Sequence, residues 1–208
     1  GCNLLSSDTP KYSVKFVDFD GTILQSKEYD YGTDLSIVTA PPDPTREGHT
    51  FIGWSGTLPL TMDSDNILIA ATYSVNQYSI EFVDFDETIL QIEEYNFDTD
   101  LTNIVDPLEP FREGYTFVGW YIDDDLLEEY VFNVMPAANI TLYAKWEINS
   151  YKINYLNSDN TLIQSFTYPY NSDLSNLVHP VQNQEGYTFL RWDDELPPLM
   201  PSHDITLT

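Results

Sequence analysis

Short stretches of alternating apolar and polar residues recur along this chain, separated by polar turns. In the segment YSVKFV, which begins at Tyr12, the apolar side chains alternate with Ser13 and Lys15. A period of two residues is typical of a β-strand that buries one face. Asp20-Gly21 then marks a tight turn before a second apolar stretch, so the pattern predicts a β-hairpin.

Three further elements follow this hairpin. Asp34-Leu35-Ser36 predicts a short helical turn that the aspartate caps. A strand over 50–52 then leads to Trp54, and the alternating stretch 67–73 predicts a closing strand. The order strand, strand, short helix, strand, strand predicts a mostly β (α+β) module with a β-grasp-like sheet.

This series of elements occurs three times. YSVKFVDFDGTILQ from Tyr12 returns as YSIEFVDFDETILQ from Tyr78 and, less closely, as YKINYLNSDNTLIQ from Tyr151. A second block, of the type REGYTFVGW, ends at Trp54, Trp120 and Trp192, and a closing block begins at Met62, Met135 and Met200. The repeat predicts tandem modules over 12–76, 77–149 and 150–208, after an N-terminal tether over 1–11.

The modules differ in two places. Seven extra residues lie between Trp120 and Met135, where the second copy reads YIDDDLLEEYVFNV, and this predicts a projecting acidic surface loop. The third copy reaches Thr208 before any counterpart of Ala144-Lys145-Trp146, so we expect its last strand to be shortened. The linkers 74–77 and 147–150 are short and lack Gly and Pro, which predicts an extended, semi-rigid string of modules.

Small modules depend on their aromatic residues for stability. A domain of about 65 residues buries only about 60% of the surface of its unfolded chain. Each buried aromatic ring removes a large apolar area from water. We therefore predict that Trp54, Trp120 and Trp192 are core anchors and not ligand platforms.

Two blocks carry a resemblance to a known family. EGYTFVGW over 113–120 and MPAANITLYAKW over 135–146 resemble the internalin B-repeat family, also called the Listeria–Bacteroides repeat. The resemblance implies a small β-grasp-like fold without catalytic activity, on bacterial surfaces, in multi-repeat proteins linked to adhesion or partner binding. The first copy ends at Tyr73 where that family has tryptophan, and Arg191 replaces a usual glycine. We expect these two copies to pack differently at their ends.

Another motif suggests a different class of protein. DFDGT over 18–22 resembles the first motif of haloacid-dehalogenase-type phosphatases, where Asp18 would be the nucleophile and Asp20 the general acid. The second copy loses the glycine at Glu87, and the third has Asn157 in place of the nucleophile. We therefore interpret the motif as a hairpin turn, and the phosphatase stays a remote alternative.

Acidic residues also suggest a cation site. Asp18 and Asp20 lie two residues apart, and the long loop of the second copy gathers Asp123, Asp124, Asp125, Glu128 and Glu129. Oxygen ligands suit Ca²⁺, but the glycine-centred calcium-loop pattern is absent, so a solvated acidic loop is the favoured interpretation. The three histidines, at 49, 179 and 203, stand apart from one another, which argues against zinc.

Composition narrows the possible partners. With 34 acidic and 8 basic residues the formal charge is −26, which disfavours nucleic acid and anionic membranes and favours solubility, basic partners or cations. The single cysteine, Cys2, excludes an internal disulfide. Gly1-Cys2 before a polar stretch resembles a mature bacterial lipoprotein, so we expect a lipid anchor on Cys2; alternatively the pair has no such role.

These observations predict a non-enzymatic protein of the bacterial cell surface, or a secreted one. It would act in adhesion and partner binding or as a spacer, and its partner would be a protein or a glycan. A variant of this hypothesis has Ca²⁺ stabilising the acidic loops. Exposed sheet edges are the expected contact surfaces, because an unpaired strand can accept a partner strand.

Overall fold

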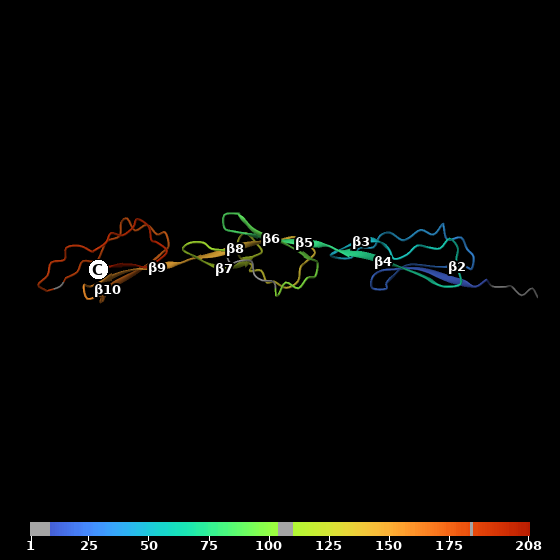
Figure 1. The fold of residues 1–208 in the computed structure, drawn as a ribbon, viewed down its shortest axis with the longest axis horizontal. Helices are drawn as coiled ribbons and strands as arrows, with labels where there is room; N and C mark the ends of the chain where they lie inside the picture. The colour runs from blue at the N-terminus through green and yellow to red at the C-terminus, as the bar shows by residue number, and fades with distance from the viewer. Residues whose placement is uncertain (1–8, 104–109, 184) are drawn as a thin grey trace, which may run out of the picture. The chain divides into compact units, whose positions relative to one another are not determined.

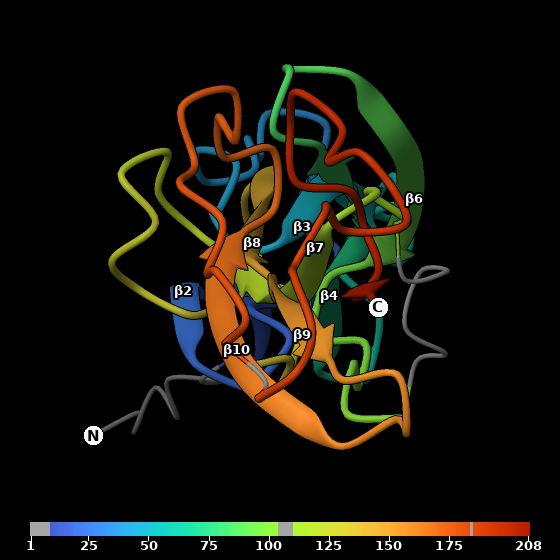
Figure 2. The same ribbon diagram turned by 90° about the vertical axis from the view of Figure 1, so that its left-hand side faces the viewer.

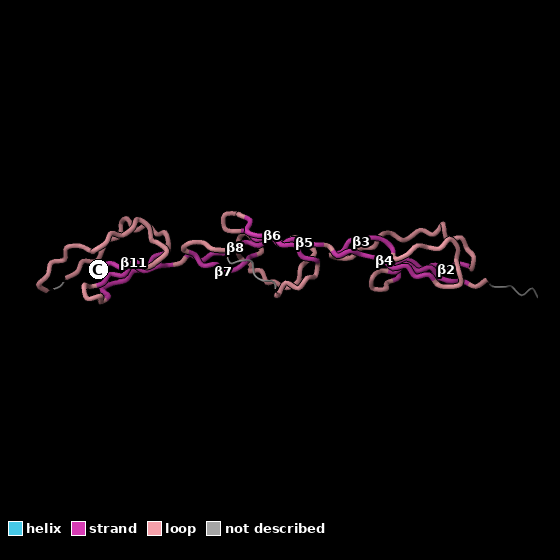
Figure 3. Tube along the Cα trace, viewed as in Figure 1, coloured by secondary structure: helices cyan, strands magenta, loops and turns pink. Residues whose placement is uncertain are grey.

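The computed structural model describes residues 9–103, 110–183 and 185–208. Every regular element in these ranges is a β-strand (Figures 1 and 3). The mostly β class predicted from the alternating pattern is therefore confirmed. The lipidation predicted for Cys2 falls outside the described residues.

The chain divides into two compact units. One comprises Gly1–Ser79, Glu94–Thr102 and Asn133–Asn139, and the other comprises Ile80–Glu93, Asn103–Phe132 and Ile140–Thr208. The second repeat thus contributes to both units. The repeat boundaries at 76/77 and 149/150 stay sequence-based predictions.

The first repeat forms a four-stranded sheet. Its strands are β1 (Lys11–Val17), β2 (Ile23–Asp30), β3 (His49–Trp54) and β4 (Ile67–Val75), in the order β2-β1-β4-β3. β1 pairs antiparallel with β2 and parallel with β4, and β3 pairs antiparallel with β4. Because a parallel pair needs a long crossover, β1 and β4 are joined through β2, β3 and the segments 31–48 and 55–66 on either side of β3. These two crossover segments supply core residues.

The second repeat reproduces this topology. Its strands are β5 (Gln77–Val83), β6 (Ile89–Asn96), β7 (Tyr115–Tyr121) and β8 (Ile140–Ile148), in the order β6-β5-β8-β7. The parallel registers correspond position by position, since Val14 pairs with Ile67 and Ile80 with Ile140. Strand register therefore allows residues of the two repeats to be compared directly.

The third repeat has a smaller sheet. β9 (Ser150–Leu156) lies between β10 (Leu162–Pro169) and the short β11 (Ile205–Leu207); Figure 2 shows β9 and β10 side by side. The stretch 187–192, which corresponds to β3, forms no strand. In the first repeat β3 pairs with Ala71–Val75 of β4. The counterpart of that β4 segment would lie beyond Thr208, and among the described residues 187–192 pairs with no strand.

The DFDGT segment is the turn of a hairpin. Asp18 N donates to Thr22 O at 2.8 Å, and Gly21 N donates to Asp18 O at 3.0 Å. The third turn residue is left-handed in every repeat, with φ of 83° at Gly21 and 66° at both Glu87 and Asn160. Glycine fits this conformation best, and the other two repeats adopt it with a side chain present.

The predicted short helical turn is a single β-turn instead. Ser36 N donates to Asp34 Oδ1 at 2.9 Å, which confirms the aspartate cap. Val38 N then donates to Leu35 O at 3.0 Å, and the chain goes no further as a helix. The prolines at 41, 42 and 44 lack the amide hydrogens that a longer helix would need. Leu35 N donates to Leu60 O at 2.8 Å, which joins the turn to a distant segment. The helix of a β-grasp fold is thus missing from the described residues.

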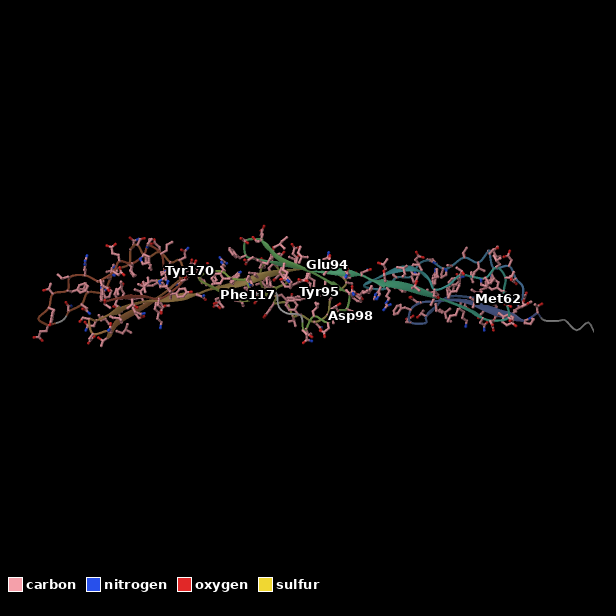
Figure 4. All side chains as sticks on the ribbon, in the orientation of Figure 1. Met62, Glu94, Tyr95, Asp98, Phe117 and Tyr170 are labelled. Carbon is pink, nitrogen blue, oxygen red and sulfur yellow. The ribbon has the colours of Figure 1, made fainter. Side chains whose placement is uncertain are left out.

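The first and third repeats each have an apolar core. In the first, Val14, Phe16 and Ile69 from the sheet meet Leu35 and Met62 from the crossover. The third repeat packs Tyr155, Leu174, Trp192, Met200 and Leu207 in the same way. The closing-block methionines are almost fully buried, with 1% of Met62, 0% of Met135 and 1% of Met200 exposed. Figure 4 shows Met62 among the side chains of the first repeat.

The repeated tryptophans pack as the sequence predicts. Trp120 and Trp192 are buried, and Trp54 is half-buried against the first core. Each lies edge-on or tilted between two aromatic rings, and in the first repeat the ring centroids of Phe16 and Trp54 are 5.0 Å apart. The tryptophans are therefore structural anchors.

Candidate functional site at the repeat joints

Successive repeats are connected by a compact joint built around one glycine and one asparagine. In the first joint Gly48 has a φ of +66° and precedes β3. Its carbonyl accepts a 2.9 Å hydrogen bond from Asn76 N, and Asn76 O accepts a 2.8 Å bond from Phe97 N, which follows β6. One linker residue thus binds the first repeat with its amide and the second with its carbonyl.

Side chains complete this joint. Thr50 Oγ1 donates to Asn76 Oδ1 at 2.6 Å, which orients the asparagine. The ring of Phe97 lies directly over Gly48, where any Cβ would overlap it. The ring of His49 meets the same ring edge-on, with centroids 5.8 Å apart. The glycine is therefore required twice, once for its backbone conformation and once for the close approach of the ring.

The second joint has the same construction. Gly114 has a φ of +76°, and its carbonyl accepts a 2.9 Å bond from Asn149 N. Asn149 O accepts a 2.8 Å bond from Tyr170 N, Thr116 Oγ1 donates to Asn149 Oδ1 at 2.7 Å, and the ring of Tyr170 covers Gly114. Tyr170 is labelled in Figure 4. Ser202 Oγ adds a 2.8 Å hydrogen bond to Glu113 Oε1.

Sequence reasoning missed the joint residues. It identified the linkers as short, but gave no role to Asn76, Asn149, Phe97 or Tyr170. The sequence did contain a signal for the two asparagines, because each linker has an asparagine directly before its last residue. Its meaning depends on partners 26 and 33 residues away in the chain.

Two residues that correspond to joint residues, but lie outside the two joints, show how the joint affects the exposure of the aromatic ring and the glycine. Tyr31 is the first-repeat counterpart of Phe97 and Tyr170, and its ring is 57% exposed. Its amide makes the corresponding bond to Pro10 O at 3.0 Å. At the other end, Gly186 has a φ of +82°, and within the described residues no atom lies near its missing Cβ. The aromatic ring is covered only where it meets the glycine of a preceding repeat.

The two aspartates of the phosphatase-like motif both serve the fold. Asp18 Oδ1 accepts bonds from Phe19 N at 2.8 Å and from the Tyr73 hydroxyl at 2.6 Å. Asp20 Oδ1 accepts a 2.9 Å bond from Thr22 N, and the hydrogen bonds with Thr22 lower the pKa of Asp20. Partial burial, together with the bond to Asp18, raises the pKa of Tyr73 to about 12. The geometry explains the motif as turn chemistry.

The second repeat makes the same contact with a different donor. Trp146 Nε1 donates to Asp84 Oδ1 at 2.9 Å, so an indole replaces the phenol of the first repeat. We expected a first copy that ends in tyrosine to pack differently here. The structure shows instead that both donors reach the corresponding carboxylate.

The acidic loop of the second repeat is a surface loop that folds back on itself. Both Asp123 carboxylate oxygens accept bonds from the Leu127 and Glu128 amides, at 2.8–3.2 Å. Asp124 and Asp125 are exposed, as are Glu128 and Glu129. In the described parts of the chain, no group of three or more His, Cys, Asp or Glu side chains is placed to hold a metal ion. Stabilisation by Ca²⁺ remains a prediction.

The histidines have separate surroundings. His49 belongs to the first joint, where its Nδ1 lies 2.8 Å from Glu47 O. His179 Nδ1 lies 3.1 Å from the Tyr155 hydroxyl at the edge of the third core, and His203 is exposed. Among the residues described, no helix is long and apolar enough to span a bilayer.

A family model and several known proteins match this chain. The Listeria-Bacteroides repeat domain model matches residues 12–66 and 78–145. A putative membrane protein of Evansella cellulosilytica is 30% identical over 200 residues, which are 88% of this chain and 29% of that protein. A putative Gly-rich membrane protein of the same organism is 30% identical over 190 residues, 87% of this chain and 21% of the relative.

Internalin H of Listeria monocytogenes is 32% identical over 125 residues, which cover 54% of this chain and 22% of that protein. The chain thus spans less than a third of the length of each of these relatives. The matched residues include both joint glycines and the first two tryptophans of the repeated blocks. The chain belongs to the Listeria-Bacteroides repeat family.

Proposed function

We propose that this chain is a non-enzymatic spacer segment of a bacterial cell-envelope protein, in which each joint holds one repeat in a fixed relation to the next. The observation that carries the proposal is the repetition of the joint: the same glycine, asparagine, threonine and aromatic positions make the same contacts at 48–97 and at 114–170.

The joints restrict the linkers in a physically simple way. A flexible linker leaves its backbone amides and carbonyls in water, whereas Asn76 and Asn149 have both groups bonded, one to each neighbouring repeat. The covering ring adds a packed contact that a change of angle between repeats would break. Fixing a residue in this way costs conformational entropy of about 1–2 kcal/mol, which the bonds and the ring contact offset.

The envelope location is supported by the names of the relatives: two are named putative membrane proteins and one is named an internalin. A lipid anchor at Cys2 would place the first repeat nearest the membrane. The net charge of −26 favours separation of neighbouring copies on a surface, because like charges repel within the screening length. Such a spacer would present a protein- or glycan-binding part of the longer protein.

The test compares two variants at corresponding positions. Phe97→Ala removes the ring that covers Gly48, and Tyr31→Ala removes the exposed ring of the first repeat. ¹⁵N relaxation would report the rotational correlation times of the first and second repeats. We expect the repeats to tumble together in the native chain and in Tyr31→Ala, and to separate in Phe97→Ala. Independent tumbling in the native chain would overturn the proposal.

A further inference from the structure

The second repeat has a cavity that the joints do not use. It measures about 610 Å³, and all its lining residues belong to the second compact unit. β5 and the turn after it supply Glu81, Val83 and Glu87, β8 supplies Tyr143, and the acidic loop supplies Asp124 and Leu126. A volume of this size is within the range of about 300–1,000 Å³ that is common for ligand pockets.

The acidic loop forms one wall and is held in place by the sheet. Lys145 Nζ donates to Leu126 O at 3.0 Å, and the same ammonium group lies 4.3 Å from the centroid of the Tyr121 ring. At the loop tip, Asp123 accepts the amides of two residues beyond Leu126. The seven-residue insertion therefore builds a defined wall.

The first repeat provides an internal comparison, because strand register relates its positions to those of the second. Lys15 stands where the second repeat has Glu81, and Ala70 stands where it has Tyr143. Its loop from Trp54 to Met62 also lacks the seven extra residues. The second repeat thus differs at three sites that all line this cavity, and one of the changes reverses a charge.

The lining combines apolar surface with negative charge. Val83 is buried, Leu126 and Tyr143 are half-buried, and Glu87 and Asp124 are exposed at the rim. The described lining residues include no lysine or arginine, and the nearby Lys145 is engaged with the loop backbone. An apolar hollow with carboxylates at its rim complements a side chain that has an aliphatic stem and a cationic head.

We propose that this cavity binds an arginine or lysine side chain, flanked by an apolar residue, from a segment of a partner protein. The aliphatic stem packs against Leu126 and Tyr143, and the cationic head is bound by Glu81 and the rim carboxylates. Such an interaction would give one repeat of the spacer a specific contact that its neighbours lack. It does not depend on the joints.

The binding test uses two peptides that differ in one charge. Acetyl-Leu-Arg-Leu-amide and its citrulline counterpart would be titrated into the ¹⁵N-labelled full chain. We expect saturable shifts of the Val83, Leu126 and Tyr143 amides with the arginine peptide alone. Equal shifts with both peptides, or shifts of similar size in all three repeats, would show that the cavity has no such specificity and would overturn the proposal.

Variants with residues taken from the first repeat test the assignment. Glu81→Lys and Tyr143→Ala each introduce the residue that the first repeat has at that position, so the fold is expected to tolerate them. Each should weaken binding by about tenfold or more. Glu28→Lys makes the same change in net charge on the exposed surface of β2 and should leave the affinity within twofold.

An equal loss of affinity in Glu28→Lys and Glu81→Lys would mean that only long-range attraction acts, and the cavity would be rejected as the site. Phe97→Ala separates this proposal from the spacer function. It should alter repeat tumbling and leave peptide binding unchanged. Loss of binding in Phe97→Ala, with the second repeat still folded, would contradict a site that is independent of the joint.

Discussion

The hydroxyl of Tyr73 donates a 2.6 Å hydrogen bond to Oδ1 of Asp18, which joins the closing strand of the first repeat to the turn of its hairpin. The two residues are 55 positions apart in the chain. The Arg46 guanidinium makes cation–π contacts next to this hydrogen bond. Its Cζ lies 4.1 Å from the centroid of the Phe19 ring and 5.8 Å from that of the Tyr73 ring. A motif that resembles a phosphatase nucleophile therefore joins the end of β1 to the neighbouring strand β4.

Tyr73→Phe should destabilise the first repeat by roughly 1.5–3 kcal/mol, because it removes a hydrogen bond to a charged acceptor at a half-buried site. Urea unfolding followed by repeat-specific NMR signals would measure the loss. Tyr31→Phe is the matched control, since that side chain is 57% exposed, and it should have no measurable effect. Equal stability of Tyr73→Phe and the native chain would show that the bond contributes nothing.

The same pair predicts a dependence on alkaline pH. The native pKa of Tyr73 is about 12, whereas the ordinary value is 10.0. The unfolded chain therefore loses this proton first as the pH rises. The stabilisation is complete below pH 10 and is lost as the pH approaches 12. The free energy of unfolding, measured across this pH interval, should decline less steeply in Tyr73→Phe than in the native chain. Equal slopes would contradict the assignment.

Three glycine substitutions separate backbone strain from the packing of the joint. Gly48, Gly114 and Gly186 all have positive φ, so alanine should cost each about 1–2 kcal/mol. At Gly48 and Gly114 the added methyl group would also displace the ring of Phe97 or Tyr170. We expect a larger loss of stability at these two positions than in Gly186→Ala. Equal losses at all three would mean that the rings move without cost.

Lys145→Met should release the acidic loop of the second repeat. Methionine keeps an apolar stem beside Tyr121 but cannot donate to Leu126 O. We expect faster hydrogen exchange at the Leu127 and Glu128 amides while β7 and β8 keep their protection. Lys152→Met, at an exposed position of β9, is the control and should leave these rates unchanged. Unchanged exchange in Lys145→Met would show that Asp123 alone holds the loop.

The aspartates at the crossover turns should titrate at low pH. Hydrogen bonds with Ser36, Thr102 and Ser175 lower the pKa values of Asp34, Asp100 and Asp173 below 3.8. Their contribution to stability is therefore complete above that value and is lost as the pH falls through the lower native pKa. Carboxyl ¹³C titration would measure these values directly, and a native pKa at or above 3.8 would contradict the capping role.

Substitution at one of these turns tests the cap itself. Asp34→Ala removes the acceptor of the Ser36 amide and should lower the stability of the first repeat. Asp34→Asn keeps an acceptor oxygen and should cost less, but it should also remove this residue's share of the acid dependence. Equal losses in the two variants would assign the stabilisation to charge and not to the hydrogen bond.

Several features of this protein follow from short stretches of sequence. Alternation around Val14 and Phe16 predicts β1 because the strand period is a property of the local backbone, and Asp20-Gly21 predicts the turn for the same reason. The repeated tryptophans are recognisable as core residues because three copies of one block mark a shared environment. The predicted helical turn after Asp34 was wrong: the chain forms one β-turn there, and Leu35 N bonds to Leu60 O, a partner that no local pattern indicates.

The sequence alone therefore determined the strands, the hairpin turns, the threefold repetition and the family, since each depends on residues that are close in the chain or that recur in the same order. Tertiary structure decided what distant residues do together. Only folding brings Phe97 over Gly48, Tyr73 to Asp18, and Leu126 and Tyr143 to the walls of one cavity. The physical reason is that the crossover between parallel strands and the linkers between repeats determine which distant residues meet. Local sequence patterns do not indicate those partners.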